Sequence, residues 1–268
     1  SQYPELLPQL STAKSPQQMF GAVIKTYFAQ KKGIAPENIT CVSIMPCMSK
    51  KRELTLPGMD SAGTGQDIDY VLTTREICRL IKADHIDVSR LPECDFDDPL
   101  GEATGAGVIF GASGGVLEAA LRTAYHTVTG ENPEIGEQSP LKVLRQIGSF
   151  KELEIDIKSV KLHCAALSSL GEARRLIQAM KRGECHYDFV EVMACPGGCI
   201  NGGGQPLRPS FQNKPKDCAD RDHCLRAYDV NSVIRFSHEN QAVQTLYDEY
   251  LEAPLSDRAH HLLHVEEY

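Results

Sequence analysis

Three cysteines combine a residue type and a spacing that could bind a metal centre. Cys195 and Cys199 are four residues apart in the glycine-rich segment VMACPGGCINGGGQP, residues 192–206, and Cys47 lies far upstream in the segment MPC. Thiolates are the ligands that zinc and iron–sulfur clusters prefer. Zinc sites usually present paired C-x2-C knuckles, whereas the pair here is C-x3-C. The spacing therefore favours an iron–sulfur cluster.

The residues around these thiols also suit a bound inorganic group. Pro46 and Pro196 restrict the backbone beside Cys47 and Cys195. Residues without a Cβ would let backbone amides come close to such a group, and they follow Pro196 as Gly197, Gly198, Gly202, Gly203 and Gly204. Two alternatives stay open on spacing alone. One is a zinc or structural module without redox chemistry, and the other is a set of unrelated buried thiols in a glycine-rich turn.

The composition is that of an ordinary globular protein and excludes several partners. A chain of 268 residues, 41% of them hydrophobic, can bury a core without disulfides. The net charge of -8 argues against nucleic acid and anionic membranes as partners. We find no apolar run of about 20 residues for a membrane span, and no secretory signal at the N-terminus. Ten cysteines are too sparse for a disulfide scaffold, which favours a reducing, cytoplasmic location.

The elements that must position the cysteines alternate between strand and helix patterns. Residues 38–45 form a short β-branched run, typical of a strand buried on both faces, that ends just before Cys47. Residues 67–74 repeat the strand pattern, and a helix capped by Thr73 or Thr74 follows. Residues 160–193 give a strand–helix–strand pattern that ends at the second motif. Ligand sites in α/β sheets form at the carboxyl ends of strands, where both motifs lie.

The fold class is therefore α/β, with two lobes of mixed or parallel sheets flanked by helices and the cluster site between them. Three further helices are predicted before the second motif: one after Ser15 and Pro16, one opened by Gly114 and Gly115, and a shorter one in residues 140–148.

The C-terminal part of the chain is predicted to begin with a loop and to end in helices. Residues 208–226 are polar and are predicted as a surface loop. A second metal site there, made by Cys218, His223 and Cys224, is a minor alternative. In residues 237–268, Ser237 and Ser256 are expected to cap two helices.

Two longer segments carry a resemblance to a known family. MPCMSKKRE, residues 45–53, resembles the MPCxxKxxE signature of iron-only (FeFe) hydrogenases, and EVMACPGGCINGGGQP, residues 191–206, resembles their ExMxCxxGCxxGGGQP signature. Other family-like segments follow in the family's order, so the resemblance covers nearly the whole chain and is weakest in residues 208–226. The family's TSCCPxW segment has no counterpart here. We therefore expect residues 1–268 to be a catalytic domain that lacks its N-terminal part.

The resemblance implies an H-cluster, which is a 4Fe-4S cube joined through a cysteine thiolate to a two-iron centre with carbon monoxide and cyanide ligands. Cys47, Cys195 and Cys199 would bind the cube, and Cys199 would also bridge to the two-iron centre, with one cube ligand missing from this chain. Lys50 would donate a hydrogen bond to a cyanide. The remaining implied site residues are the walls Met45 and Met193, the pocket-lining Ser15, Pro16, Gln17 and Phe110, and Ser11 in the proton path.

The implied activity is the reversible interconversion of H2 with protons and electrons, with ferredoxin or a similar carrier as electron partner. Maturation proteins and the missing N-terminal part would be further partners, and the location would be the cytoplasm of an anaerobe, or an organelle such as the hydrogenosome. The isolated chain is expected to be inactive. An alternative is a relative that acts in iron–sulfur protein assembly and binds only a 4Fe-4S cluster, although Lys50, Met45 and Met193 weigh against it.

Two weaker alternatives involve other residues. His260 and His264 are spaced to bind a metal from one helix face, but they are more simply solvated or capping residues. Gly105, Gly107 and Gly111 miss the GxGxxG spacing of a dinucleotide-binding loop.

Overall fold

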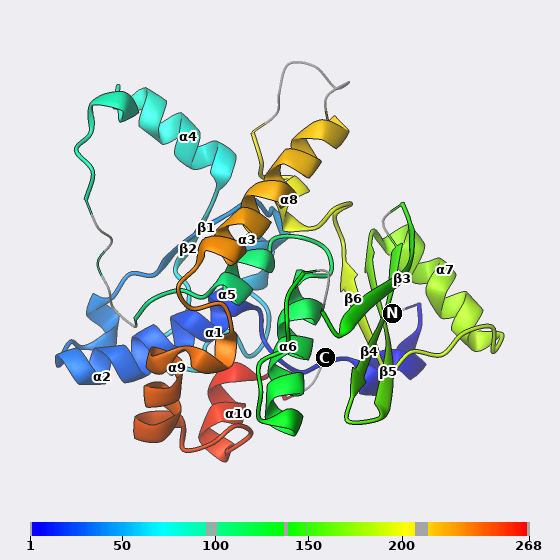
Figure 1. Cartoon of the computed structure of the whole chain (residues 1–268). Coiled ribbons are helices and arrows are strands. Elements are labelled where there is room, and N and C mark those ends of the chain that lie inside the picture. Colours follow the sequence, from blue (N-terminus) through cyan, green and yellow to red (C-terminus); the bar gives the residue numbers. More distant parts are fainter. Residues whose placement is uncertain are drawn as a thin grey trace. The chain divides into compact units, whose positions relative to one another are not determined.

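A computed structural model of the chain describes residues 2–94, 97, 101–136, 139–148, 150–206 and 214–266, with the backbone alone described at 214–217. The chain divides into two compact units (Figure 1). Unit 1 comprises Ser1–Gly101 and Gln241–Tyr268, and unit 2 comprises Glu102–Asn240. Each unit has its own sheet with helices around it, so the predicted α/β class is confirmed.

Unit 1 is built on a two-stranded parallel sheet. Strands β1 (Val42–Met45) and β2 (Tyr70–Thr73) pair in register, with Val42 opposite Tyr70 and Met45 opposite Thr73. Its helices are α1 (Pro16–Val23), α2 (Ala29–Lys32), α3 (Ser49–Glu53), α4 (Thr74–Ala83), α9 (Gln241–Leu246) and α10 (Asp257–Leu263). π-helical turns join α1 to α2 (Ile24–Phe28) and follow α9 (Tyr247–Leu251). The largest core cluster packs α1 against the two C-terminal helical segments through Ala22, Leu251, Ala259 and Leu262.

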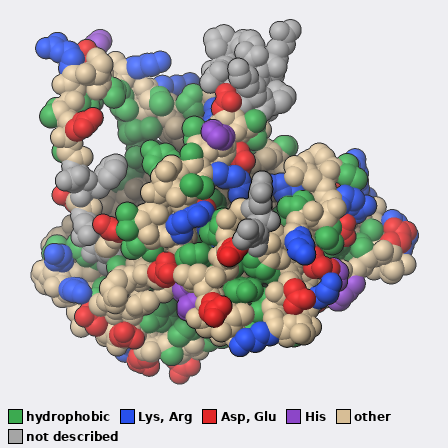
Figure 2. Space-filling model, viewed as in Figure 1, with side chains coloured by type: hydrophobic (Ala, Val, Ile, Leu, Met, Phe, Trp, Pro, Cys, Tyr) green, Lys and Arg blue, Asp and Glu red, His purple; other side chains and the backbone are tan. Residues whose placement is uncertain are grey.

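The strand predicted before Cys47 exists, but its predicted burial on both faces is wrong. Val42 and Ile44 are 50% and 54% exposed, and Tyr70 on the neighbouring strand is 62% exposed. Side chains alternate along a strand, so these residues share one face while Val71 and Thr73 are buried on the other. Figure 2 shows hydrophobic side chains at the surface over β1, β2 and α4. Helix packing in unit 1 covers only one face of this small sheet.

Of the four predicted helix caps, two are present and two are not. Thr73 caps α4 in a full capping box with Glu76, as the sequence predicts. Ser256 caps α10 by accepting a hydrogen bond from the Ala259 amide at 3.1 Å. Ser15 precedes α1 but its side chain makes no cap, and the prediction for Ser237 is wrong because it begins only a short 3-10 turn (Ser237–Glu239). The next helix, α9, starts at Gln241.

Unit 2 is built on a four-stranded mixed sheet of order β3-β4-β5-β6. Strands β3 (Leu141–Ile147), β4 (Phe150–Ile157) and β5 (Val160–Ser168) are antiparallel, and β6 (Phe189–Met193) runs parallel to β5. The main helices are α5 (Gly105–Ile109), α6 (Gly115–Thr129), α7 (Leu170–Lys181) and α8 (Lys214–Asn231). Helices α6 and α7 cover opposite faces of the sheet (Figure 1). Alternate residues of β5 accordingly enter the two cores, with Cys164 on the α6 side and Ala165 on the α7 side.

Two further predictions for unit 2 are wrong, the second of them for the described residues 214–226. Residues 140–148 were expected to form a short helix, but they contain β3, which pairs with β4. Its side chains are mostly exposed because β3 is an edge strand, so its apolar spacing carries little information about a core. Residues 208–226 were expected to be a surface loop. From Lys214 onward they belong to α8, in which Pro215 occupies the first turn, where a missing N–H does no harm. Residues 208–213 lie outside the described part.

Within the described residues, no helix has the length and apolar character needed to cross a membrane.

Candidate metal-cluster site

In unit 1, Cys47 lies two residues beyond the carboxyl end of β1, and α3 begins two residues later. Its thiol is half-buried and is not part of a disulfide. Cys41, just before the same strand, is different because it packs in the core with Ile68 and Val71, and burial raises the pKa of its thiol. A partly accessible thiol at a strand end has the surroundings of a ligand, whereas Cys41 has those of a core residue.

A single carboxylate, that of Glu53, organises the other predicted residues of unit 1. Lys50 Nζ lies 2.9 Å from Glu53 Oε1, and this pair spans one turn of α3. Ser15 Oγ and Gln17 Nε2 donate to the other oxygen, Oε2, at 2.8 and 2.7 Å. Gln17 Oε1 in turn accepts a hydrogen bond from Ser43 Oγ of β1 at 2.8 Å. The structure therefore brings three predicted site residues onto Glu53, which the sequence analysis left without a role.

The remaining predicted residues of unit 1 are less connected to that network. Pro16 is an exposed first residue of α1, and Ser11 is exposed and accepts a hydrogen bond from the Ala13 amide at 3.3 Å. Met45 is half-buried and packs on the core cluster of Cys41, Ile68 and Val71. The expectation that Met45 forms a wall of the site stays a prediction.

In unit 2, Cys195 and Cys199 lie in the segment that leaves β6, residues 194–202, which we call the cysteine loop. Cys195 is half-buried, Cys199 is exposed, and neither is in a disulfide. The loop turns back on itself through a hydrogen bond from the Gly198 amide to the Cys195 carbonyl at 2.9 Å. The Gly197 amide donates to Ser168 Oγ at the end of β5, at 2.8 Å.

The cysteine loop also lies on the α5–α6 connection, residues 110–114. The Ser113 amide donates to the Gly197 carbonyl at 3.2 Å, and the Ile200 amide donates to the Gly111 carbonyl at 3.0 Å. From the other side, Arg221 Nη1 of α8 donates to the Ile200 carbonyl at 2.8 Å. The two cysteines are therefore carried by a loop whose backbone is tied to β5, to the α5–α6 connection and to α8.

For two of the glycines the structure shows a reason other than the predicted approach of backbone amides to a bound inorganic group. Gly197 and Gly198 have φ of 82° and 96°, which favour glycine. A Cβ on Gly198 would lie 2.7 Å from the Ser113 amide nitrogen and 2.8 Å from the Gly111 carbonyl oxygen. A Cβ on Gly197 would lie 2.5 Å from Cys218 Sγ. These glycines thus let the loop pack closely on its own protein. Gly202 ends the 3-10 turn Cys199–Asn201 with an ordinary negative φ, and Gly203 and Gly204 follow it.

Sequence analysis missed two side chains around the cysteine loop, one acidic (Glu191) and one with a hydroxyl (Ser168). Glu191 of β6 is buried, and it accepts hydrogen bonds from the amides of Gly114 and Leu117 at 2.6 and 2.8 Å. Burial raises the pKa of Glu191, while the backbone amides and Lys151 act in the opposite direction. Ser168 is completely buried. The only sequence signal for Glu191 was its place as the first residue of the ExMxC motif.

Met193 and Phe110 flank the same loop. Met193 is the last residue of β6, and its carbonyl accepts a hydrogen bond from the Ser169 amide at 2.7 Å. Phe110 follows α5 directly, at the start of the α5–α6 connection. Both side chains are half-buried. Their predicted roles as site walls are not tested by these contacts.

The donor set suits a cluster with thiolate ligands. Cys47, Cys195 and Cys199 are outside disulfides, follow strand ends and are at least partly accessible. Within the described ranges, no group of three or more His, Cys, Asp or Glu side chains is arranged to hold a metal ion. Cys47 belongs to unit 1 and the other two cysteines belong to unit 2. Their convergence on one cluster therefore stays a prediction.

The other proposed metal ligands have different surroundings. His260 and His264 stack with ring centroids 5.0 Å apart, and His264 Nδ1 lies 2.9 Å from Thr12 Oγ1. Cys218, predicted in a loop, lies on α8 with its sulfur against Gly197, and burial raises the pKa of its thiol. Neither set belongs to a metal-binding group in the part of the chain that is described.

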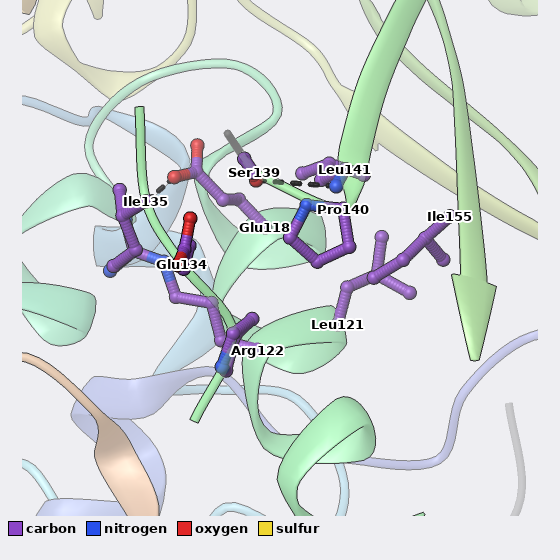
Figure 3. Close-up of a pocket in the computed structure, with 10 residues that line it drawn as sticks. Glu118, Leu121, Arg122, Glu134, Ile135, Ser139, Pro140, Leu141 and Ile155 are labelled. Atoms are coloured by element: carbon purple, nitrogen blue, oxygen red, sulfur yellow. Dashed lines mark hydrogen bonds and ion pairs between the residues drawn. The ribbon is translucent and has the colours of Figure 1, made fainter. Parts of the chain in front are cut away.

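A small cavity in unit 2 lies beside α6 (Figure 3). It is lined by Glu118 and Arg122 of α6 together with Ile135, Pro140 and Ile155, and has a volume of about 20 Å³. Such a volume holds about one water molecule. Glu118 and Arg122 are paired with each other at 2.6 Å. This cavity is therefore too small to be a substrate pocket.

An α/β fold with partly accessible thiols outside disulfides at its strand ends is typical of the class of proteins that bind a metal cluster through cysteine. The family model "Iron only hydrogenase large subunit, C-terminal domain" matches residues 1–203, and the model "Iron hydrogenase small subunit" matches residues 218–266. The chain belongs to the iron-only hydrogenase family. The second match begins at Cys218, within the segment where the sequence resemblance was weakest.

Curated relatives include hydrogenases and assembly proteins. The chain is 44% identical to the NADP-reducing hydrogenase subunit HndD of Solidesulfovibrio fructosivorans over 98% of its length, and 44% identical to iron hydrogenase 1 of Clostridium pasteurianum over 98%. It is 34% identical to the cytosolic iron-sulfur assembly component 3 of Rattus norvegicus over 97%. The matched regions make up 44%, 45% and 54% of those proteins. The chain thus spans about half the length of the curated relatives it matches.

Solved structures give the same family. The chain superposes on the apo FeFe-hydrogenase HydA1 from Chlamydomonas reinhardtii with a TM-score of 0.83 and 38% identity, covering 99% of this chain and 71% of that one. A structure that reveals stepwise H-cluster assembly in an FeFe-hydrogenase matches with a TM-score of 0.82 and 38% identity, covering 72% of its chain.

Proposed function

We propose that this chain is part of an iron-only hydrogenase that reversibly interconverts H2 with protons and electrons. The observation that carries the proposal is the placement of the motif residues. Cys47 follows the end of β1 with Lys50 one turn further on, and Cys195 and Cys199 follow the end of β6 in a braced loop. The match to hydrogenases over nearly the whole chain supports the same conclusion.

Cys47, Cys195 and Cys199 are the proposed ligands of a 4Fe-4S cube, with Cys199 also bridging to a two-iron centre. Thiolates suit both metal groups. The fourth cube ligand would come from polypeptide that this chain does not contain. When bound, the two-iron centre would supply the chemistry by which the H–H bond is split or formed, and the cube would carry the electrons.

Lys50 is the proposed hydrogen-bond donor to a cyanide ligand. Its ammonium is already held by Glu53 at 2.9 Å, and the side chain is 24% exposed. Glu53 thus limits the orientations of the Lys50 side chain, so that a remaining N–H of the ammonium can donate to a bound group. Ser15 and Gln17 converge on the same carboxylate and would orient that wall of the pocket.

The other residues are proposed to shape the pocket and to move protons. Met45, Met193, Phe110 and Pro16 would line it with apolar surface and exclude water, and Ser11 would pass a proton through its hydroxyl. Gly197, Gly198, Gly202, Gly203 and Gly204 would hold the cysteine loop in its compact path. Ferredoxin or a similar carrier would exchange electrons, and maturation proteins would deliver the two-iron centre. The cytoplasm of an anaerobe, or a hydrogenosome, is the proposed location.

The decisive experiment measures which metal group the full chain binds. Anaerobic reconstitution with iron and sulfide, followed by reduction with dithionite, should give the electron paramagnetic resonance signal of a reduced 4Fe-4S cube, and Cys195→Ser should reduce the bound iron several-fold. Cys94→Ser is the matched control, because Cys94 is exposed and outside both motifs. Zinc binding without sulfide, or equal iron loss in both variants, would contradict the proposal.

The assembly relative remains a second candidate, because such proteins match 97% of this chain at 34% identity. Infrared spectroscopy after co-expression with maturation proteins separates the two. Bands of iron-bound carbon monoxide and cyanide support the hydrogenase, whereas a cube without these bands supports the assembly function. We expect the isolated chain to evolve no H2, because a cube ligand is missing. Measured H2 evolution would overturn that expectation.

A further inference from the structure

The α5–α6 connection is the support on which the cysteine loop lies. Its Ser113 amide and its Gly111 carbonyl both bond to the loop, at Gly197 and at Ile200. The contact is so close that a Cβ on Gly198 would overlap the backbone of the connection at both Ser113 and Gly111. The position of this connection therefore sets where the backbone beside Cys195 and Cys199 can lie.

Glu191 holds that connection to the sheet. Its side chain is on β6, two residues before Met193, and its two oxygens accept from the amides of Gly114 and Leu117 at 2.6 and 2.8 Å. These amides begin α6, where backbone N–H groups lack partners within the helix and favour a negative charge. Glu191 is only 7% exposed, so water cannot replace it at either amide.

A short path of contacts leads from Glu191 to the cysteines. Gly114, held by Glu191, is the neighbour of Ser113, whose amide bonds to Gly197 between the two cysteines. Lys151 Nζ of β4 donates to the Ser113 carbonyl at 3.3 Å and fixes the connection from the sheet as well. The path consists of hydrogen bonds within the protein and the peptide bond between Ser113 and Gly114.

We propose that Glu191 is a positioning residue for Cys195 and Cys199. It holds the α5–α6 connection in the position that the cysteine loop requires, so the two thiols are placed before any metal binds. It acts through Gly114 and Ser113 and touches neither thiol nor metal. The relevance to a cluster rests on the proposed function, but the positioning itself is a property of the metal-free chain.

The chemistry of the pair of acceptors explains why the side chain is a glutamate. A glutamine of the same shape keeps one acceptor oxygen but turns its NH2 group toward a backbone N–H. One hydrogen bond is then lost, and two donor groups face each other. An aspartate keeps both oxygens but is one methylene shorter. We therefore expect the cysteine loop to be less ordered in Glu191→Asp than in wild type, and least ordered in Glu191→Gln.

The test uses the full metal-free chain and hydrogen exchange of individual amides. In Glu191→Gln, the Ser113 and Ile200 amides should exchange about tenfold faster or more, as expected when a hydrogen bond to a charged group is lost. Glu154→Gln is the matched control: Glu154 is a half-buried carboxylate of β4 in the same sheet, paired with Lys161 at 3.3 Å. Its substitution should leave both amides unchanged.

A purely structural role predicts a different pattern. In that case only the Gly114 and Leu117 amides, the direct partners of Glu191, exchange faster, and such a result would overturn the proposal. Alkylation of Cys195 gives a second readout, and its rate should rise in Glu191→Gln while that of Cys94 stays constant. If Glu191→Gln does not fold, Glu191→Asp decides: faster exchange at Ile200 supports the proposal, and wild-type exchange contradicts it.

Iron binding is measured separately, so that the two proposals can fail independently. Faster loop exchange in Glu191→Gln, together with a chain that binds zinc but no iron–sulfur cluster, would support the positioning role and contradict the proposed hydrogenase function. Normal loop exchange together with cluster binding would remove the positioning role and keep the hydrogenase.

Discussion

At the scale of single residues, carboxylates rather than cysteines organise the predicted site residues within each unit. Glu53 gathers Ser15, Gln17 and Lys50, and Glu191 gathers the start of α6. Both are glutamates of the two motifs. A glutamate has a long side chain and two acceptor oxygens, so each can bind segments that are far apart in sequence. Each is also enclosed, with the Glu53 side chain 17% exposed, which makes its bonds hard for water to replace.

Replacing Glu53 should loosen three predicted site residues together. In Glu53→Ala, Lys50, Ser15 and Gln17 lose their shared acceptor, and the free energy of unfolding should fall by about 1–3 kcal/mol. Urea unfolding measures this change. Glu37→Ala is the control, since Glu37 is an exposed carboxylate of unit 1 and should change stability by less than about 0.5 kcal/mol. Equal effects of the two variants would show that the Glu53 network carries no special stability.

At the scale of elements, the cysteine loop depends on close packing against backbone. Gly198→Ala should destabilise the chain for two reasons, its φ of 96° and the overlap of a Cβ with Ser113 and Gly111. Gly183→Ala is a matched control, because Gly183 has a φ of 71° but open space around it. The control should cost about 1–2 kcal/mol from backbone strain alone. We expect Gly198→Ala to cost clearly more in denaturant unfolding, and equal costs would refute the packing argument.

Helix α4 should depend on pH through its capping box. Lys51 and the Thr73 amide and hydroxyl lower the pKa of Glu76 to about 2 from its ordinary 4.5. Because the folded-state pKa is depressed, the stabilisation is present above about pH 4.5 and is lost as the pH falls toward 2. Hydrogen exchange of α4 amides should accelerate over this range. Glu76→Gln should remove that pH dependence, and its persistence would show that another group is responsible.

At the scale of the whole molecule, a buried ion cluster connects the segments that match the two family models. Arg122 of α6 lies in the large-subunit match, and Asp229 of α8 lies in the small-subunit match. Their side chains are 5% and 4% exposed and 2.9 Å apart, and Arg235 adds a second contact to Asp229 at 2.7 Å. Burial alone raises the pKa of Asp229, but the two guanidinium groups hold it below its ordinary value.

Removing the charge of Asp229 should therefore strongly destabilise unit 2. Asp229→Asn removes the carboxylate that Arg122 and Arg235 share and leaves Arg122 paired with Glu118 alone, so the expected loss is up to about 3–5 kcal/mol. Thermal or urea unfolding measures it. Asp220→Asn, on an exposed position of the same helix, is the control and should have little effect. A small loss for Asp229→Asn would mean that water reaches the two arginines.

Local patterns in the sequence predicted the elements that carry the cysteines. The strand before Cys47, the capping box at Thr73 and the strand–helix–strand pattern ending at the second motif are all present. Each depends on residues only a few positions apart, where backbone preferences and side-chain period act directly. The motif cysteines are accordingly found at strand ends, as the pattern indicates.

Contacts between distant segments were decided only by the tertiary structure. Residues 140–148 form a strand because β4 pairs with them, and α8 forms where composition alone indicated a loop. Glu191 meets an amide 77 residues away, and Gln17 meets a carboxylate 36 residues away. A periodic pattern reports which face of an element is apolar, but not which distant amide or carboxylate will lie against it. That choice is made when the elements pack, because each enclosed polar group must then find its partner within the protein.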